Sequence, residues 1–320
     1  MSANVQPKLE KLNVDYGQVR GQPFAYFFCP ILFRDEDVLL CKAHIVNLAF
    51  PESSQVWTVQ RKDVDNFYGS TFESEFVTVQ YKENRTLGDA ITDKMLSKTL
   101  KPKILVDDEP VDFFVAGSEI PKHFTRVEFD NDGKVIQLGL KMSPEDVLAA
   151  TGRKWEIAIS KDVRVSALVS LIKAAHLTLF EMLGYQYALS TGGYFVGRQI
   201  LGEFFLQNRD KQKSDVLENA HPFFREFTHM VRPIQSSGID FQGTITDNLL
   251  LICKENNGPP WAFIIFIKTS QSLHAVMLPI FDQPYTVDKF LRFLQDENDS
   301  IEVALTRFEQ EQWKINKESS

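Results

Sequence analysis

The N-terminal part of the chain alternates between short apolar runs and charged turns, a pattern typical of small β-strands. Residues 24–33 and 38–46 are rich in aromatic and β-branched side chains, and the charged tetrad at 34–37 separates them. These two runs predict a β-hairpin, and residues 54–60 alternate well enough for a further strand. At 63–76 the apolar positions return at helical spacing, which predicts a short helix.

Downstream the pattern changes twice. A β-rich stretch predicts short strands near 103–107, 111–116, 124–129, 134–141 and 156–160. Helices are expected where apolar side chains recur every three or four positions, at 161–182, 194–205, 288–294 and 302–316. Residues 208–219 are polar and predict a loop, and strands return between 238 and 281.

These elements predict an α+β protein with two domains. The basic, proline-containing segment at 94–103 is the expected linker. Residues 1–100 would hold a small ββα finger behind a polar, loosely structured lead-in at 1–20. Residues 101–320 would hold a larger mixed domain with antiparallel sheets and a central helix pair.

Composition narrows the possible partners and location. The chain has 35 basic and 43 acidic residues, a formal net charge of −8. This balance argues against a large non-specific nucleic-acid surface, which needs clustered Lys and Arg. Three Cys cannot build a disulfide framework, so we expect a reducing, cytoplasmic location. No stretch reaches the roughly 18 continuous apolar residues of a membrane span, so no membrane partner is expected.

His44 is the first candidate for chemistry. It lies at the end of the second expected strand, three residues after Cys41 and fifteen after Cys29. A lone His in an apolar run is often a structural residue, and His176, among apolar neighbours on the long helix, is expected in the core. Two thiols and one imidazole are too few for a closed, four-ligand zinc site, so structural zinc is not expected.

Acidic residues near the predicted short helix form a second candidate. Asp63, Asp65 and Asn66 offer oxygen donors close together, and Glu73 and Glu75 follow further along the same segment. Hard oxygen ligands suit Mg²⁺ or Mn²⁺. Acids are also favoured at a helix N-terminus by the macrodipole, so both interpretations remain open.

Together, the Cys29-Pro-Ile-Leu32 turn, His44 and Asn66 resemble the HNH, or His-Me finger, nuclease superfamily. The resemblance is confined to the N-terminal segment. It implies a ββα-metal finger in which His44 is the general base and Asn66 supports it in the catalytic site. His44 would deprotonate a water that attacks a phosphodiester.

The resemblance also assigns the remaining polar residues of the finger. One Mg²⁺ or Mn²⁺ ion would be held by Asp63, Asp65 and Glu75. Arg61 and Lys62 would hold a flanking phosphate. On this interpretation the chain is a metal-dependent HNH endonuclease, a hydrolase acting on nucleic acid, and prokaryotic defence is the setting that the resemblance suggests.

The sequence departs from the family pattern at positions that matter for catalysis. Leu32 stands where zinc-supported members have a second Cys, and Ala43 stands where an acid normally precedes the His. Two alternatives therefore stay open: an inactive nuclease-like scaffold that binds and works through a partner, or an unrelated α+β protein. A protein partner or homo-oligomer is expected because the aromatic-rich strands and the helices at 161–205 offer extensive apolar surface.

Overall fold

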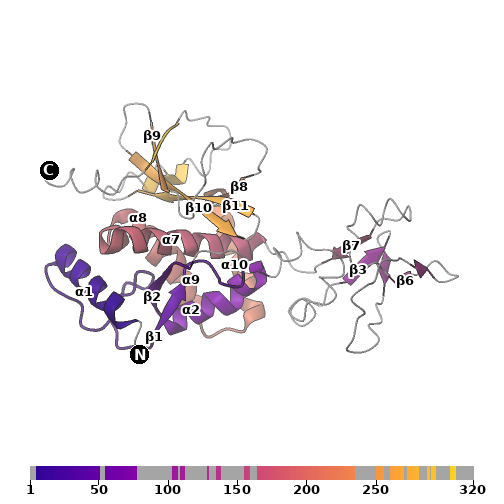
Figure 1. Ribbon diagram of the computed structural model, residues 1–320, viewed down its shortest axis with the longest axis horizontal. Helices are drawn as coiled ribbons and strands as arrows, with labels where there is room; N and C mark the ends of the chain where they lie inside the picture. Colours follow the sequence, from indigo (N-terminus) through magenta and orange to yellow (C-terminus); the bar gives the residue numbers. More distant parts are fainter. Residues whose placement is uncertain are drawn as a thin grey trace. The chain divides into compact units, whose positions relative to one another are not determined.

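A computed structural model of the chain (Figure 1) describes residues 5–50, 55–77, 103–106, 109–111, 128–129, 135–137, 155–158, 164–234, 250–255, 260–269, 272–280, 287–288, 290–292 and 303–307. These helices and antiparallel sheets confirm the α+β class. The chain divides into a first unit, Met1–Glu73 with Val165–Ser320, and a second unit, Ser74–Arg164. The second unit is thus an insertion in the first, a division that differs from the predicted boundary after residue 100.

Residues 24–73, here called the finger, contain one antiparallel strand pair followed directly by a helix. Strand β1 (Leu40–His44) pairs with β2 (Trp57–Arg61), and His44 lies opposite Trp57. Helix α2 (Lys62–Tyr68) follows without a break and continues into the π-helical turn η1 (Gly69–Glu73). The predicted runs at 38–46 and 54–60 therefore pair with each other, and His44 ends the first strand of the pair.

The predicted strand at 24–33 is wrong. Its one strand-like contact among the described residues is an isolated bridge between Phe28 and Asp35. The chain instead turns at Cys29, whose carbonyl accepts from Phe33 N at 2.9 Å, and Phe33 has a φ of 56°. Pro30 inside the run has no N–H to offer a strand partner, which favours the turn.

The prediction of a loosely structured lead-in at 1–20 is also wrong, because residues 6–20 form a regular helix. In α1 (Gln6–Arg20), Leu9 and Leu12 are buried, and Gly21 ends the helix at a φ of 79°. Lys8 forms a 2.7 Å ion pair with Glu181 of a later helix. The helix packs through a narrow apolar face, which was not recognised in the sequence because most of its residues are polar.

Helix α7 (Arg164–Ala188) is the core of the first unit and matches the helix predicted at 161–182. Its backbone is non-helical at Gly184, where φ is 62° and an added Cβ would lie 2.0 Å from Asp15 Oδ2. Among the described helices, α7 alone is long and apolar enough to cross a membrane. However, 83% of its most apolar 18-residue window is buried inside the protein. Such burial is what a core helix of a folded domain shows.

Short helices follow α7 and lead to a five-stranded sheet. They are α8 (Thr191–Tyr194), the π-helical η2 (Phe195–Gly202), α9 (Glu203–Asn208), α10 (Lys213–Phe224) and the 3₁₀ turn η3 (Arg225–Met230). The loop predicted at 208–219 is thus wrong beyond its first residues. Val216 and Ala220 recur at helical spacing and are buried, which explains the helix.

The sheet of the first unit has the strand order β12-β9-β10-β11-β8 and is antiparallel throughout. Its strands are β8 (Val231–Ile234), β9 (Leu250–Glu255), β10 (Pro260–Thr269), β11 (Ser272–Pro279) and β12 (Val303–Arg307). The helix predicted at 302–316 is wrong where it is described, because Val303–Arg307 pairs with β9. Figure 1 shows the helices α7 and α8 between the finger and this sheet.

The second unit consists of small antiparallel sheets. One has the order β4-β3-β7, formed by Glu109–Val111, Lys103–Val106 and Trp155–Ala158. The other pairs β5 (Glu128–Phe129) with β6 (Val135–Gln137). The strands β3, β5, β6 and β7 overlap the predicted ones, whereas β4 shares only Val111 with the strand predicted at 111–116. The rest of that predicted strand, and most of the linker expected at 94–103, lie outside the described residues.

Candidate functional site

His44 is placed at the end of β1 by the pairing of the finger strands. Its Nδ1 is buried and has no hydrogen-bond partner among the described residues. Burial lowers the pKa of the imidazole, Lys42 lowers it further, and Asp65 acts in the opposite direction. The ring is therefore neutral at pH 7 and could accept a proton, as a general base must.

The acids near His44 are neutralised by a lysine from a distant part of the chain. Lys173 of α7 is fully buried, and its Nζ lies 3.1 Å from Asp65 Oδ1 and 2.7 Å from Glu73 Oε1. Asn47 Nδ2 donates to the other oxygen of Glu73 at 3.4 Å. Burial acts to lower the pKa of Lys173, but the carboxylates of Glu73 and Asp65 outweigh it and raise the pKa. The ammonium thus stays charged between two carboxylates.

Asp63 is held by a different cation. The buried guanidinium of Arg61 contacts Asp63 through Nε at 3.1 Å and Nη2 at 2.8 Å, and its Nη1 donates to Glu36. Burial opposes ionisation of Asp63, but the hydrogen bonds from Arg61 outweigh it and lower the pKa of the carboxyl. Arg61 is therefore occupied by two carboxylates of its own chain.

The predicted metal and phosphate residues do not meet at one point. Among the residues that the structure describes, no three His, Cys, Asp or Glu side chains gather so that they could hold a metal ion. Asp63 pairs with Arg61, Asp65 with Lys173, and Glu75 is buried in the second unit. Asn66 and Lys62 are exposed on α2.

Both cysteines of the finger are protonated thiols at neutral pH. Cys29 is fully buried, and burial raises its pKa to about 11. Cys41 is half-buried, and burial together with Asp65 raises its pKa to about 12. Each thiol donates within the fold, Cys29 to Gln60 Oε1 at 3.2 Å and Cys41 to Asp65 Oδ2 at 3.7 Å. Metal binding would require the thiolate forms.

Sequence reasoning missed Lys173 and Asn47, and it considered Glu73 as a possible metal ligand and not as the partner of a buried lysine. The signal for Lys173 was a single charge within the apolar run Val169–His176, a position where a lysine needs a buried partner. The expectation for His176 is confirmed: it is buried, with Nδ1 3.0 Å from Tyr187 Oη and Nε2 3.1 Å from the Pro30 carbonyl oxygen. Burial lowers its pKa to about 4, so it is a neutral core residue that ties α7 to the finger.

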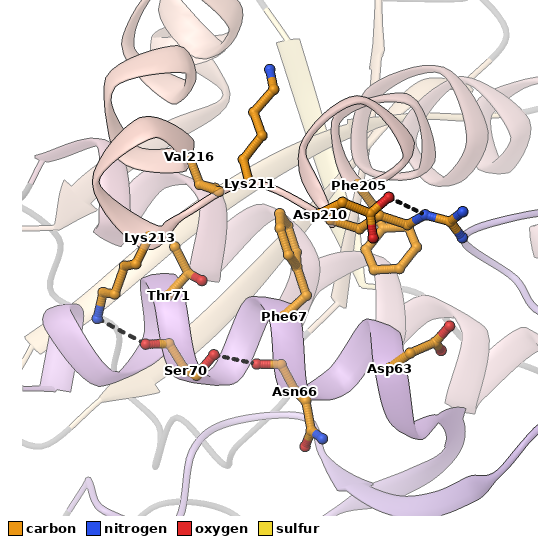
Figure 2. Close-up of a pocket in the computed structure, with 11 residues that line it drawn as sticks. Asp63, Asn66, Phe67, Ser70, Thr71, Phe205, Asp210, Lys211, Lys213 and Val216 are labelled. Atoms are coloured by element: carbon orange, nitrogen blue, oxygen red, sulfur yellow. Dashed lines mark hydrogen bonds and ion pairs between the residues drawn. The ribbon is translucent and has the colours of Figure 1, made fainter.

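The opposite side of α2 borders a separate, open groove of about 460 Å³ (Figure 2). Asp63, Asn66, Phe67 and Ser70 line it at the one-face spacing i, i+3, i+4 and i+7 of an α-helix. The facing wall comes from the end of α9, the loop at 209–212 and the start of α10. Asp65, which points to Lys173, is not part of this lining.

No protein family, curated protein or solved structure matches this chain. The resemblance to HNH nucleases therefore rests on the residues of the finger alone.

Proposed function

We propose that this chain is a binding protein that keeps a nuclease-like finger without cutting nucleic acid, and that it works through a partner. The observation that supports this is the Lys173 ammonium between Asp65 and Glu73. Asp65, whose charge acts on His44, and Glu73 already share a cation of the chain.

A catalytic metal ion at this position would meet strong repulsion. A divalent cation about 4 Å from the ammonium would be repelled by roughly 8 kcal/mol at an effective dielectric constant of about 20. Moving Lys173 aside would leave a buried charge without its partners, which is also strongly unfavourable. Hydrolysis by an HNH mechanism needs that ion to stabilise the leaving oxygen, so a neutral His44 alone is insufficient.

The electrostatics of the whole chain favour the same proposal. A protein with a net charge of −8 has little electrostatic attraction for the phosphates of DNA. Arg61, which the resemblance assigns to a phosphate, is buried and bound to Asp63 and Glu36. Of the two cations that the resemblance assigns to a phosphate, Lys62 alone is exposed to the solvent.

Plasmid nicking in Mg²⁺ and in Mn²⁺ tests the loss of catalysis. We expect the purified wild-type protein to nick no faster than the His44→Ala variant prepared in parallel. Nicking that requires a divalent ion and disappears in both His44→Ala and Asp65→Asn would overturn the proposal.

Metal binding gives a second test that is independent of any substrate. Mn²⁺ should leave the melting temperature of the wild-type protein unchanged. In Lys173→Gln, Asp65 and Glu73 lose their cation, and Mn²⁺ should then raise the melting temperature in a saturable way. Saturable stabilisation of the wild type by Mn²⁺, lost in Asp65→Asn, would contradict the proposal even if the Lys173 variant fails to fold.

The partner proposed is a second copy of the chain. Three of the six exposed large apolar side chains among the described residues lie in the finger: Leu39 is 75%, Tyr26 54% and Leu48 47% exposed. Their burial between copies would remove apolar surface from water. Light scattering across a concentration series should show self-association that Leu39→Glu weakens. A strict monomer at every concentration would refute this part of the proposal.

A further inference from the structure

The backbone of the finger strands has a fixed alternation of inward and outward groups. At the two ends of the ladder, Leu39 O accepts from Lys62 N at 2.8 Å, and Ile45 N donates to Val56 O at 3.2 Å. In an antiparallel pair, every second residue turns both its N–H and its C=O toward the neighbouring strand. Odd-numbered residues of β1 therefore bond to β2. The residues of β1 that turn their backbone groups outward are Leu40, Lys42 and His44.

The outer edge of β2 is closed by the protein itself. Trp57, whose C=O points away from β1, accepts a hydrogen bond from Lys8 Nζ of α1. At the other end of β2, Arg61 N donates to the side-chain oxygen of Gln60 at 2.8 Å. Val59, between Trp57 and Arg61, is fully buried. A further strand therefore has no place on this edge.

The outer edge of β1 is open. In the part of the chain that the structure describes, nothing hydrogen-bonds to the backbone groups that Leu40, Lys42 and His44 turn outward. The side chain of Lys42 is exposed, and those of Leu40 and His44 are half-buried. Lys42 Nζ lies 5.0 Å from the centroid of the Trp57 ring, so this side chain leans over β2 and leaves the edge clear. A row of unpaired N–H and C=O groups is a template for another strand.

Exposed leucines flank this open edge. Leu39, which is 75% exposed, directly precedes β1, and Leu48, which is 47% exposed, follows it in the sequence. When two identical strands pair antiparallel, the start of one lies beside the end of the other. Leu39 of each copy would then come near the segment that carries Leu48 in the other copy. Pairing of two copies thus supplies backbone partners and removes apolar surface from water at the same time.

We propose that β1 pairs with β1 of a second copy across a two-fold axis. The two finger hairpins then form one antiparallel sheet in the order β2-β1-β1-β2. This pairing rests on the proposed self-association, for which it supplies the contact. The same edge serves both copies, so the interface is isologous and closes on itself. Because the outer edges of the new sheet are the closed edges of β2, association ends at the dimer.

Amide hydrogen exchange, resolved to single residues on the full-length wild-type protein, tests this pairing. At concentrations where light scattering shows a monomer, the outward amide of Lys42 should exchange rapidly. The inward amides of Cys41 and Ala43 should exchange slowly, because they bond to β2. At concentrations where light scattering shows a dimer, exchange at Lys42 should slow by about tenfold or more, while Cys41 and Ala43 change little.

A proline at position 42 removes the outward N–H and leaves the hydrogen bonds between β1 and β2 in place. Lys42→Pro should weaken dimerisation by about tenfold or more, because the same hydrogen bond is lost in both copies. Lys42→Ala is the matched control, since it removes the same ammonium but keeps the N–H, and it should dimerise like the wild type. Circular dichroism checks that both variants fold. The exchange measurement on the wild type decides the question if the proline variant does not fold.

The outcomes distinguish the β1 pairing from the proposed function. Self-association that Leu39→Glu weakens, with exchange at Lys42 independent of concentration, would overturn the pairing and leave the proposed function intact. Slow exchange at Lys42 in the monomer would also overturn it, because a segment of the same chain would then cover the edge. Growth beyond the dimer would contradict the closed edge of β2. A strict monomer at every concentration would overturn both the pairing and the proposed self-association.

Discussion

The two sides of α2 treat charge in opposite ways. On the side that faces α7, Asp65 and Glu73 share the fully buried Lys173. On the side that faces the groove, Lys211 is exposed and donates to the neutral Asn208 Oδ1 at 3.1 Å. In the first arrangement the charges join two segments of the fold, and in the second the ammonium of Lys211 is exposed to solvent.

This contrast is the reason for proposing binding rather than hydrolysis for a helix that resembles a metal site. A buried carboxylate without a partner is unstable, so the fold supplies one, and the carboxylate is then unavailable to a metal ion. A solvated lysine needs no such partner, because water satisfies it in the free protein.

The largest expected loss of folding stability comes from the side of α2 that faces α7. Lys173→Met leaves Asp65 and Glu73 without their cation and should lower the free energy of unfolding by roughly 3–5 kcal/mol. Urea denaturation followed by circular dichroism measures this loss. The matched control is Lys173→Met combined with Glu73→Gln, which removes one of the two stranded carboxylates and should restore part of the stability. An unchanged unfolding midpoint in Lys173→Met would show that the ion pairs do not stabilise the fold.

Acid should destabilise the same interior through His176. Its pKa falls from 6.5 to about 4 on folding, so the folded state favours the neutral ring. The stability that this contributes is complete above pH 6.5 and is lost as the pH falls, by about 3 kcal/mol at pH 4. Unfolding free energies measured from pH 7 to pH 4 should fall less steeply in His176→Gln than in the wild type. His274, whose pKa burial also lowers to about 4, should sustain part of the slope in that variant. Parallel slopes in the two proteins would contradict this role.

The ion pairs at the border of the groove should contribute less than those of Lys173. Arg61 is buried, but the side chains of Asp63 and Glu36 are 45% and 40% exposed, so water can solvate them after a substitution. We expect Arg61→Met to lower the free energy of unfolding by about 1–2 kcal/mol. Chemical denaturation beside Lys173→Met makes the comparison direct. A larger loss in Arg61→Met than in Lys173→Met would reverse the contrast between the two sides of α2.

The local features of the finger were predictable from the sequence because they depend on neighbours in the chain. The runs at 38–46 and 54–60 pair as β1 and β2, and α2 follows within the range predicted for a helix. Gly184 interrupts α7 at a φ of 62°, a left-handed conformation that favours glycine. The strand predicted at 24–33 does not form, because Pro30 and the turn after Cys29 prevent strand pairing despite the apolar pattern.

The chemistry of the site was not predictable in the same way. Lys173 reaches Glu73 across 100 residues of sequence and Asp65 across 108, with the whole second unit inserted between them. Spacing within the finger cannot show that a distant ammonium neutralises these acids. The groove depends on the same kind of long-range contact, since its two walls come from α2 and from residues 205–216.

The smallest expected change in folding stability comes from the side of α2 that faces the groove. Lys211→Glu should change the free energy of unfolding by no more than about 0.5 kcal/mol, as is usual for exposed positions. Its acceptor, Asn208 Oδ1, also receives a hydrogen bond from Asn219 Nδ2 at 3.1 Å, so no buried group is left without a partner. Urea denaturation of Lys211→Glu next to the wild type measures the difference. A loss above about 1 kcal/mol would mean that Lys211 is a structural cation like Lys173, and the contrast between the two sides of α2 would fail at that residue.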